Sequence, residues 1–179
     1  MKKVIITGAT GAIGHALVDI CLERGIECYV LLNPHSKRND RIRKHPLVHT
    51  VLLGLDQLKD GAASLPVDCD AFFHMGWMGT FGPSRNDMNL QTRNIQYTLD
   101  AVALAKVCGC HTFVGAGSQA EYGRVDGILR PDTPTNPENG YGIGKLCAGQ
   151  MSRIMCQQLG IKHIWTRILS VYGPWDGPN

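Results

Sequence analysis

The chain alternates short apolar runs with longer stretches in which apolar residues recur every three or four positions. The apolar runs fall at residues 4–7, 28–32, 48–53, 71–74, 112–115 and 161–169. Runs of this length are typical of buried strands, whereas a spacing of three or four residues is typical of helices. Strands that alternate with helices form parallel βαβ units. We therefore expect an α/β fold, a Rossmann-type doubly wound parallel sheet with helices on both faces.

Three stretches have helical spacing. The first runs through Ile13, Leu17, Ile20 and Cys21, and Gly25 closes it. The second, residues 85–108, has two apolar stripes, so we expect it to be buried over more than one face. Its stripes are Met88, Ile95, Leu99 and Val102, and Leu90, Tyr97, Ala101, Leu104 and Cys108. The third, residues 141–159, begins with YGIGK, and each glycine in a helix costs about 1 kcal/mol relative to alanine. So poor a start requires an explanation.

Composition narrows the class of protein. The 179 residues, 44% of them hydrophobic, suit one domain spanning residues 1–179. A formal net charge of +3 without basic runs argues against nucleic acid as a partner. Seven cysteines, an odd number without zinc-finger spacing, predict reduced thiols and no metal site. The apolar run after the first two lysines is too short for a signal peptide, so we expect a cytoplasmic protein with no membrane partner.

A glycine-rich turn connects the first predicted strand to the first predicted helix. It reads TGATGAIG, with the spacing G-x-x-G-x-x-G. Such a turn lets backbone N–H groups approach a diphosphate at the N-terminus of the helix. We assign the tight turn to Gly8, the close approach to Gly11, and the packing of helix on strand to Gly14. The strand before and the helix after this turn predict a dinucleotide site.

The end of the second predicted strand bears on which dinucleotide binds. An acidic residue there would accept hydrogen bonds from the ribose 2′-hydroxyl of NAD. The sequence has Asn33 at that point, followed by Ser36, Lys37 and Arg38 and then Arg41, and these side chains could meet the 2′-phosphate of NADP. A solvated basic loop is the alternative, and Asn33 could still serve NAD. We expect NADP in preference to NAD.

Tyr141 and Lys145 lie four residues apart, and therefore on one face of the third helix. An ammonium group nearby lowers the pKa of a tyrosine by about 1–3 units from about 10. The pair would then supply a general acid/base, with Gly142 and Gly144 leaving room for cofactor and substrate. Ser118, at the end of the fifth predicted strand, could donate a hydrogen bond to a substrate oxygen. An ordinary surface Tyr–Lys pair is the alternative.

Together these motifs resemble the short-chain dehydrogenase/reductase superfamily and, within its extended branch, the NAD-dependent epimerase/dehydratase family that acts on sugar nucleotides. The resemblance covers essentially the whole chain through TGATGAIG, AFFHMGW, GAGSQAEYG, NGYGIGK and RILSVYGP. It implies that Ser118, Tyr141 and Lys145 are catalytic and that hydride passes between a nicotinamide and a sugar carbon. The cofactor contacts that it implies are Gly8, Gly11, Ala12 and Ile13 in the glycine turn, His74, Met75, Gly76 and Trp77 after the fourth strand, Asn94 on the long helix, and Tyr141, Lys145, Ile168, Leu169 and Ser170 near the nicotinamide.

The chain departs from the family pattern in two ways. The 4,6-dehydratases carry an Asp-Glu pair directly after the hydroxyl residue of strand five, where this chain has Gln119 and Ala120. We therefore expect an epimerase or a reductase. Members also continue beyond RILSVYGP into a smaller substrate domain, so we expect residues 1–179 to be an N-terminal fragment of a longer two-domain enzyme.

The resemblance also implies partners. The substrate would be a nucleotide sugar, and the protein would form a homodimer through residues 85–108 and 141–159, since relatives commonly dimerise through these two helices. A non-catalytic NAD(P)-binding module or redox sensor is the alternative function.

Overall fold

The computed structural model describes residues 1–175, so the last four residues of the predicted domain, 176–179, lie outside the described part. Six strands form one sheet in the order β3-β2-β1-β4-β5-β6, and all neighbouring pairs are parallel. The strands are β1 (Lys3–Thr7), β2 (Glu27–Leu32), β3 (Val48–Leu52), β4 (Ala71–His74), β5 (Thr112–Ser118) and β6 (Lys162–Ile168). This order confirms the predicted Rossmann-type sheet.

Each predicted apolar run is a strand, with small differences at the ends. The largest difference is in β5, which continues through Gly115 and Gly117 to Ser118. This added segment pairs with β6, from Gly115 opposite Trp165 to Ser118 opposite Ile168. Pairing with the neighbouring strand thus outweighs the weak strand propensity of glycine.

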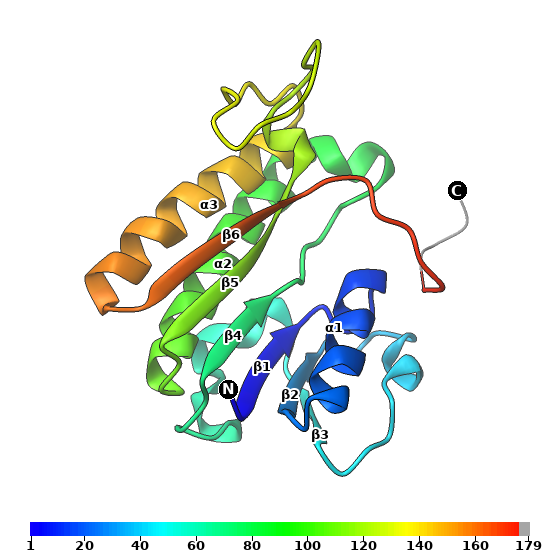
Figure 1. The fold of residues 1–179 in the computed structure, drawn as a ribbon, viewed down its shortest axis with the longest axis vertical. Helices are drawn as coiled ribbons and strands as arrows, with labels where there is room; N and C mark the ends of the chain where they lie inside the picture. Colours follow the sequence, from blue (N-terminus) through cyan, green and yellow to red (C-terminus); the bar gives the residue numbers. More distant parts are fainter. Residues whose placement is uncertain (176–179) are drawn as a thin grey trace.

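Helices cover both faces of the sheet. In Figure 1, α2 (Met88–Val107) and α3 (Gly140–Leu159) lie on one face and α1 (Ala12–Glu23) lies on the other. Ile5 packs with the residues under α2 and α3, whereas Val4 and Ile6 pack with those under α1. This division follows from the geometry of a strand, in which successive side chains point to opposite faces.

Two of the three predicted helices differ from expectation. The stretch that begins at residue 85 is helical only from Met88, because η3 (Gly82–Asn86) is a short 3₁₀ helix and the Asp87 side chain caps α2 by accepting a hydrogen bond from Leu90 N at 3.0 Å. On α1, the predicted Ile13 and Ile20 are exposed, whereas His15 and Val18 are buried. The predicted Cys21 is buried and Leu17 packs against the same cluster, so the apolar spacing gave only part of the buried face.

Among the described residues, the remaining connections carry three further 3₁₀ helices, and the longest stretch without a helix or strand lies between Glu121 and Gly140. These helices are η1 (Asn39–Arg41), η2 (Leu55–Ser64) and η4 (Gln119–Glu121), and η2 packs its buried Leu58 under the face covered by α2. No helix within residues 1–175 has the length and apolar character needed to cross a membrane.

Candidate active site

Two adjoining cavities lie at the carboxyl ends of the strands. One, of about 640 Å³, extends from the glycine turn to the end of β2. The other, of about 1030 Å³, surrounds Ser118, Tyr141 and Lys145. Both are lined in part by Met75 and Trp77, so they form one continuous cleft. Open α/β sheets bind ligands at this edge, next to the point where the strand order reverses between β1 and β4.

Most predicted site residues line this cleft. Four of those named do not: Lys37 and Arg41 are exposed outside it, and His74 and Asn94 are buried behind it. Those that line the cleft are Gly8, Gly11, Ala12, Ile13, Gly14, Asn33, Ser36, Arg38, Met75, Gly76, Trp77, Ser118, Tyr141, Lys145, Ile168, Leu169 and Ser170.

The glycine turn brings backbone close to backbone. Gly8 has φ +72°, and a Cβ there would lie 2.6 Å from Gly76 N in the loop after β4. A Cβ at Gly14 would overlap the carbonyl oxygen of Gly8, so Gly14 packs α1 against the turn itself. Gly11 is the N-cap of α1 and makes no side-chain cap hydrogen bond. The first N–H groups of α1 therefore border an open part of the cavity.

The loop after β2 is held by its own hydrogen bonds. Asn33 Oδ1 accepts from His35 N at 2.9 Å, and the Asn33 carbonyl accepts from Asn39 Nδ2 at 2.9 Å. Ser36 and Arg38 border the cavity, and Ser36 Oγ accepts from Arg38 N at 3.2 Å. No acidic side chain occupies residues 33–38.

The loop after β4 is fixed by polar groups beneath it. Thr7 Oγ1 lies 3.1 Å from His74 Nδ1 and accepts from Gly76 N at 3.1 Å, and Thr98 Oγ1 lies 3.3 Å from His74 Nε2. Burial lowers the pKa of His74 to about 3, so this histidine is neutral and structural. Asn94 Oδ1 accepts from Met78 N at 3.0 Å, and its Nδ2 donates to Met78 O at 2.8 Å. Asn94 therefore supports the loop and does not reach the cavity.

Lys145 is almost fully buried, with 3% of its surface exposed. Its Nζ donates to the carbonyl oxygen of Ala116 at 2.6 Å and lies 3.9 Å from the centre of the Trp77 ring. Its distance from the centre of the Tyr141 ring is 5.8 Å. Burial lowers the pKa of Lys145 to about 7.

The prediction that Lys145 lowers the pKa of Tyr141 is wrong for this structure. Burial raises the pKa of Tyr141, and the groups that oppose this rise are the Ser118 hydroxyl and the Arg85 guanidinium. Arg85 Cζ lies 4.4 Å from the centre of the Tyr141 ring, nearer than Lys145 Nζ. Lys145 is hydrogen-bonded to the Ala116 carbonyl of β5, and Arg85 is therefore the cation that lies nearer to the phenol ring.

The two glycines of YGIGK serve packing within the protein. A Cβ at Gly142 would overlap the carbonyl oxygen of Ala120, and one at Gly144 would lie 3.4 Å from both Trp77 Cζ2 and Gln91 Cβ. The prediction that these glycines leave room for ligands is therefore wrong. Gly142 lets the first turn of α3 approach η4 closely, whereas a methyl group at Gly144 would make only ordinary contacts with Trp77 and Gln91.

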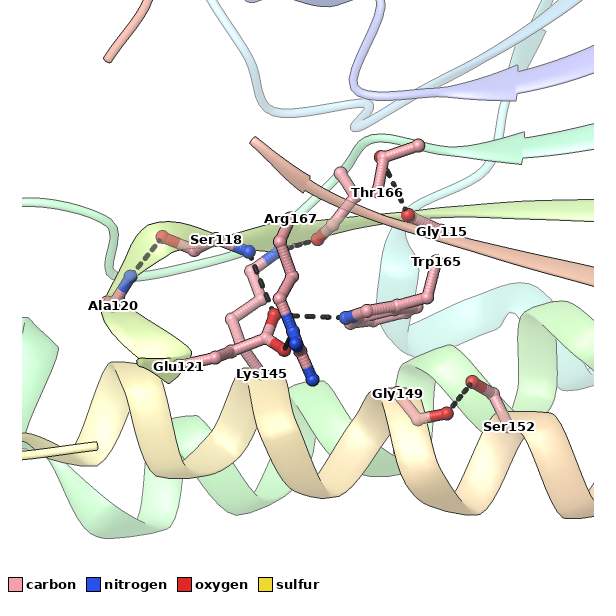
Figure 2. A network of polar contacts seen from close by, with 11 residues as sticks. Gly115, Ser118, Ala120, Glu121, Lys145, Gly149, Ser152, Trp165, Thr166 and Arg167 are labelled. Atoms are coloured by element: carbon pink, nitrogen blue, oxygen red, sulfur yellow. Dashed lines mark hydrogen bonds and ion pairs between the residues drawn. The ribbon is translucent and has the colours of Figure 1, made fainter. Parts of the chain in front are cut away.

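A buried carboxylate connects the end of β5 to the neighbouring strand β6. Glu121, which has no exposed surface, accepts hydrogen bonds from Ser118 N at 2.8 Å, Trp165 Nε1 at 2.9 Å and Arg167 Nε at 2.9 Å (Figure 2). Glu121 and the partly exposed Arg167 form an ion pair, and the hydrogen bond from Ser118 N to Glu121 holds the backbone at the end of β5.

Sequence reasoning missed several of these residues. Arg85, Gln91, Glu121 and Arg167 were not among the predicted site residues. Gln91 is 2% exposed, and its Oε1 accepts a hydrogen bond from Trp77 Nε1 at 2.8 Å. The available signal was a polar residue at a helical position that faces the core, but the residues that it contacts lie far away in the sequence.

Potential metal ligands do not gather at this edge. In the described part of the chain, residues 1–175, no three His, Cys, Asp or Glu side chains lie together as a metal site requires.

Solved structures of two sugar-nucleotide epimerases share this fold. A UDP-glucose 4-epimerase of Thermus thermophilus, in complex with NAD, superposes with a TM-score of 0.86 at 23% identity, covering 99% of this chain and 58% of that one. A UDP-galactose 4-epimerase superposes with a TM-score of 0.81 at 25% identity, covering 92% of this chain and 55% of that one.

Two relatives found by sequence are also named as enzymes of nucleotide sugars. The uncharacterized UDP-glucose epimerase YtcB of Bacillus subtilis is 26% identical over 99% of this chain and 59% of its own length. The dTDP-6-deoxy-L-talose 4-dehydrogenase (NAD(+)) of Aggregatibacter actinomycetemcomitans is 28% identical over 80% of this chain and 51% of its own length. The chain thus spans between half and three fifths of the length of these two relatives. The family model matches residues 4–179, and the chain belongs to the NAD-dependent epimerase/dehydratase family.

Proposed function

We propose that the chain is the cofactor-binding and catalytic part of an NAD-dependent oxidoreductase or epimerase that acts on a nucleotide-activated sugar. The observation that carries this proposal is the meeting of Ser118, Tyr141 and Lys145 in a cavity that continues into the glycine turn. The substrate class is taken from the relatives, two of which are named for UDP-glucose and a dTDP-deoxysugar. We propose that this class extends to the present chain.

The residues of the cleft fit a dinucleotide. The open N-terminus of α1, next to the strained turn at Gly8, suits a diphosphate. The cavity volumes are of the size that small ligands occupy. Gly8, Gly11 and Ile13 would hold the diphosphate, while Met75, Trp77 and Ile168 would border the nicotinamide. When bound, the nicotinamide supplies hydride transfer to or from a sugar carbon.

We propose NAD as the cofactor in place of the predicted NADP. One of the relatives is named for NAD(+), and none of those described here supports a preference for NADP. Lys37, which was expected to contribute to a 2′-phosphate site, does not border the cavity, although Ser36 and Arg38 do. A fluorescence titration with NADH and, separately, with NADPH tests this choice, since tighter binding of NADPH would restore the original prediction.

Within the proposed reaction, Tyr141 moves the proton. Because burial raises the pKa of Tyr141, the phenol is protonated near neutral pH and can donate to a substrate carbonyl oxygen. The Ser118 hydroxyl lies on the same cavity wall and would donate to the same oxygen. In the opposite direction, the phenolate would accept the proton of a sugar hydroxyl.

Dehydration is not part of the proposal. Gln119 is exposed and its amide donates to Ser170 Oγ at 3.3 Å, and Ala120 has only a methyl side chain. Neither position offers the acid/base pair that elimination of water requires. We therefore propose epimerisation or ketone reduction.

Substitution of Tyr141 by phenylalanine tests the proposed function. With UDP-glucose and dTDP-deoxysugars as trial substrates, Tyr141→Phe should lower turnover by at least about 100-fold, since general acid/base catalysis contributes about 10²–10⁴-fold. Its affinity for NADH should stay within about twofold of the wild-type value. Turnover that survives in the variant would exclude Tyr141 as the acid/base. A full-length protein that binds NADH but turns over none of these sugars would favour a non-catalytic NAD-binding module.

A further inference from the structure

The ammonium group of Lys145 is buried without an acidic partner. The side chain is 3% exposed, and its one hydrogen bond within the described residues is to the Ala116 carbonyl. No carboxylate in residues 1–175 lies within ion-pair distance of its Nζ, and the buried Glu121 is engaged with Ser118 N, Trp165 and Arg167. Buried charges are normally paired, because removing them from water is costly. Glu121 favours the charged form of Lys145 without direct contact, so the group that touches the ammonium must be another one.

That group is the face of the Trp77 ring. Lys145 Nζ lies 3.9 Å from its centre, and the ring meets Tyr141 edge-on with its centre 6.2 Å away. A cation over an indole face is attracted by the negative face of the ring, and the attraction is stronger when water is excluded. Trp77 therefore contacts both members of the Tyr141–Lys145 pair.

The indole is itself held in place. Its Nε1 donates to Gln91 Oε1 at 2.8 Å, and Gln91 Nε2 donates to the carbonyl oxygens of Ser84 at 2.9 Å and Gly79 at 3.2 Å. The far edge of the ring rests near Gly144, where a Cβ would lie 3.4 Å from Trp77 Cζ2. The Gln91 amide, which is itself held by backbone carbonyls, thus fixes the ring in one orientation.

We propose that Trp77 is a positioning residue for Lys145: the face of its indole takes the place of a contacting carboxylate and favours the charged form of the ammonium group beside Tyr141. The contribution to turnover rests on the function proposed above, whereas the contact itself does not. Gln91 acts on Lys145 only through Trp77, because it orients the indole ring.

A series of fluorinated tryptophans at position 77 tests this proposal without removing the ring. Fluorine withdraws electron density from the face of the indole and changes its volume little, so packing and hydration stay nearly constant. Mono-, di- and tetrafluorinated tryptophan would be incorporated at position 77 alone. The pKa of Lys145 would be measured by NMR titration of the lysine-labelled chain, with the signal assigned through Lys145→Arg.

The pKa of Lys145 should fall stepwise with the number of fluorines, by about half a unit to one unit over the series. The matched control is the same series at Trp175, whose ring lies 4.3 Å from that of His15 and 6.0 Å from Arg41 Cζ. That series should leave the pKa of Lys145 unchanged. An equal pKa across the Trp77 series, or a rise, would overturn the proposal.

This titration needs neither cofactor nor sugar, so its result is independent of the proposed function. A stepwise fall together with full turnover by Tyr141→Phe would retain the Trp77 contact and reject the enzymatic mechanism. A flat series together with lost turnover in Tyr141→Phe would do the reverse.

Discussion

Burial of Lys145 makes the stability of the chain depend on pH. Its pKa is about 7 in the folded chain, compared with an ordinary value of 10.5. Between these values the unfolded chain binds a proton that the folded chain does not. The free energy of unfolding should therefore rise with pH, by up to about 1.4 kcal/mol per pH unit from this group.

Substitution of this lysine should remove that rise. We expect urea unfolding of Lys145→Met to depend less steeply on pH than that of the wild type between about pH 7 and pH 8.5, the window below the ordinary titration of the thiols. Lys162→Met, which removes an exposed lysine at the start of β6, is the matched control and should retain the wild-type slope. Equal slopes for wild type and Lys145→Met would show that Lys145 keeps its charge in the folded chain.

Arg85 should lower the pKa of Tyr141. Its guanidinium lies 4.4 Å from the centre of the ring and opposes the rise caused by burial. Arg85→Met should therefore raise the pKa of Tyr141, by up to about one unit. The titration can be followed by NMR of the tyrosine-labelled chain, with Arg85→Lys as the charge-preserving control. A pKa that is the same in Arg85→Met and Arg85→Lys would leave the packing of Arg85, and not its charge, as its contribution.

At the scale of the element, α2 shows why its apolar stripes predicted only some of its buried positions. Gln91, Asn94 and Thr98 are buried on this helix although all three are polar. They are spaced three and four residues apart, as a buried row requires. Their partners, however, are backbone atoms after β4 and the His74 ring. A pattern of hydrophobicity cannot identify a buried row whose purpose is hydrogen bonding to a distant loop.

Removal of the amide from this row should destabilise the fold. Asn94→Ala leaves Met78 N and Met78 O without their partners, at a cost of about 2–5 kcal/mol in the free energy of unfolding. Asn89→Ala, at an exposed position on the same helix, should change that free energy by less than about 0.5 kcal/mol. Urea unfolding measures both. If the two variants cost the same, the Met78 backbone groups must find water or other partners.

At the scale of the whole molecule, the sequence predicted what parallel topology brings together. Ser118 follows β5, the glycine turn follows β1 and Trp77 follows β4, and the carboxyl ends of parallel strands meet at one edge of a sheet. The structure places these residues along one cleft as a result. Contacts set by side-chain packing were not predictable in this way. The ion pair of Glu121 with Arg167, 46 residues apart, depends on the register of β5 against β6, and the position of Lys145 depends on the Trp77 ring.

The predicted homodimer can be tested on the outer surface of α3. Ile143, Met151 and Ile154 are exposed there, and their spacing places them along one side of the helix. If two copies associate through this row, Met151→Lys should bury an unpaired charge in the interface and give a monomer. Ile20→Lys is the control, since Ile20 is 45% exposed, close to the 44% of Met151, but lies on α1 on the opposite face of the sheet (Figure 1). Light scattering after size-exclusion chromatography should then show a monomer for Met151→Lys and a dimer for Ile20→Lys. The reverse result would move the interface to α1, and a monomeric wild type would remove the homodimer from the proposal.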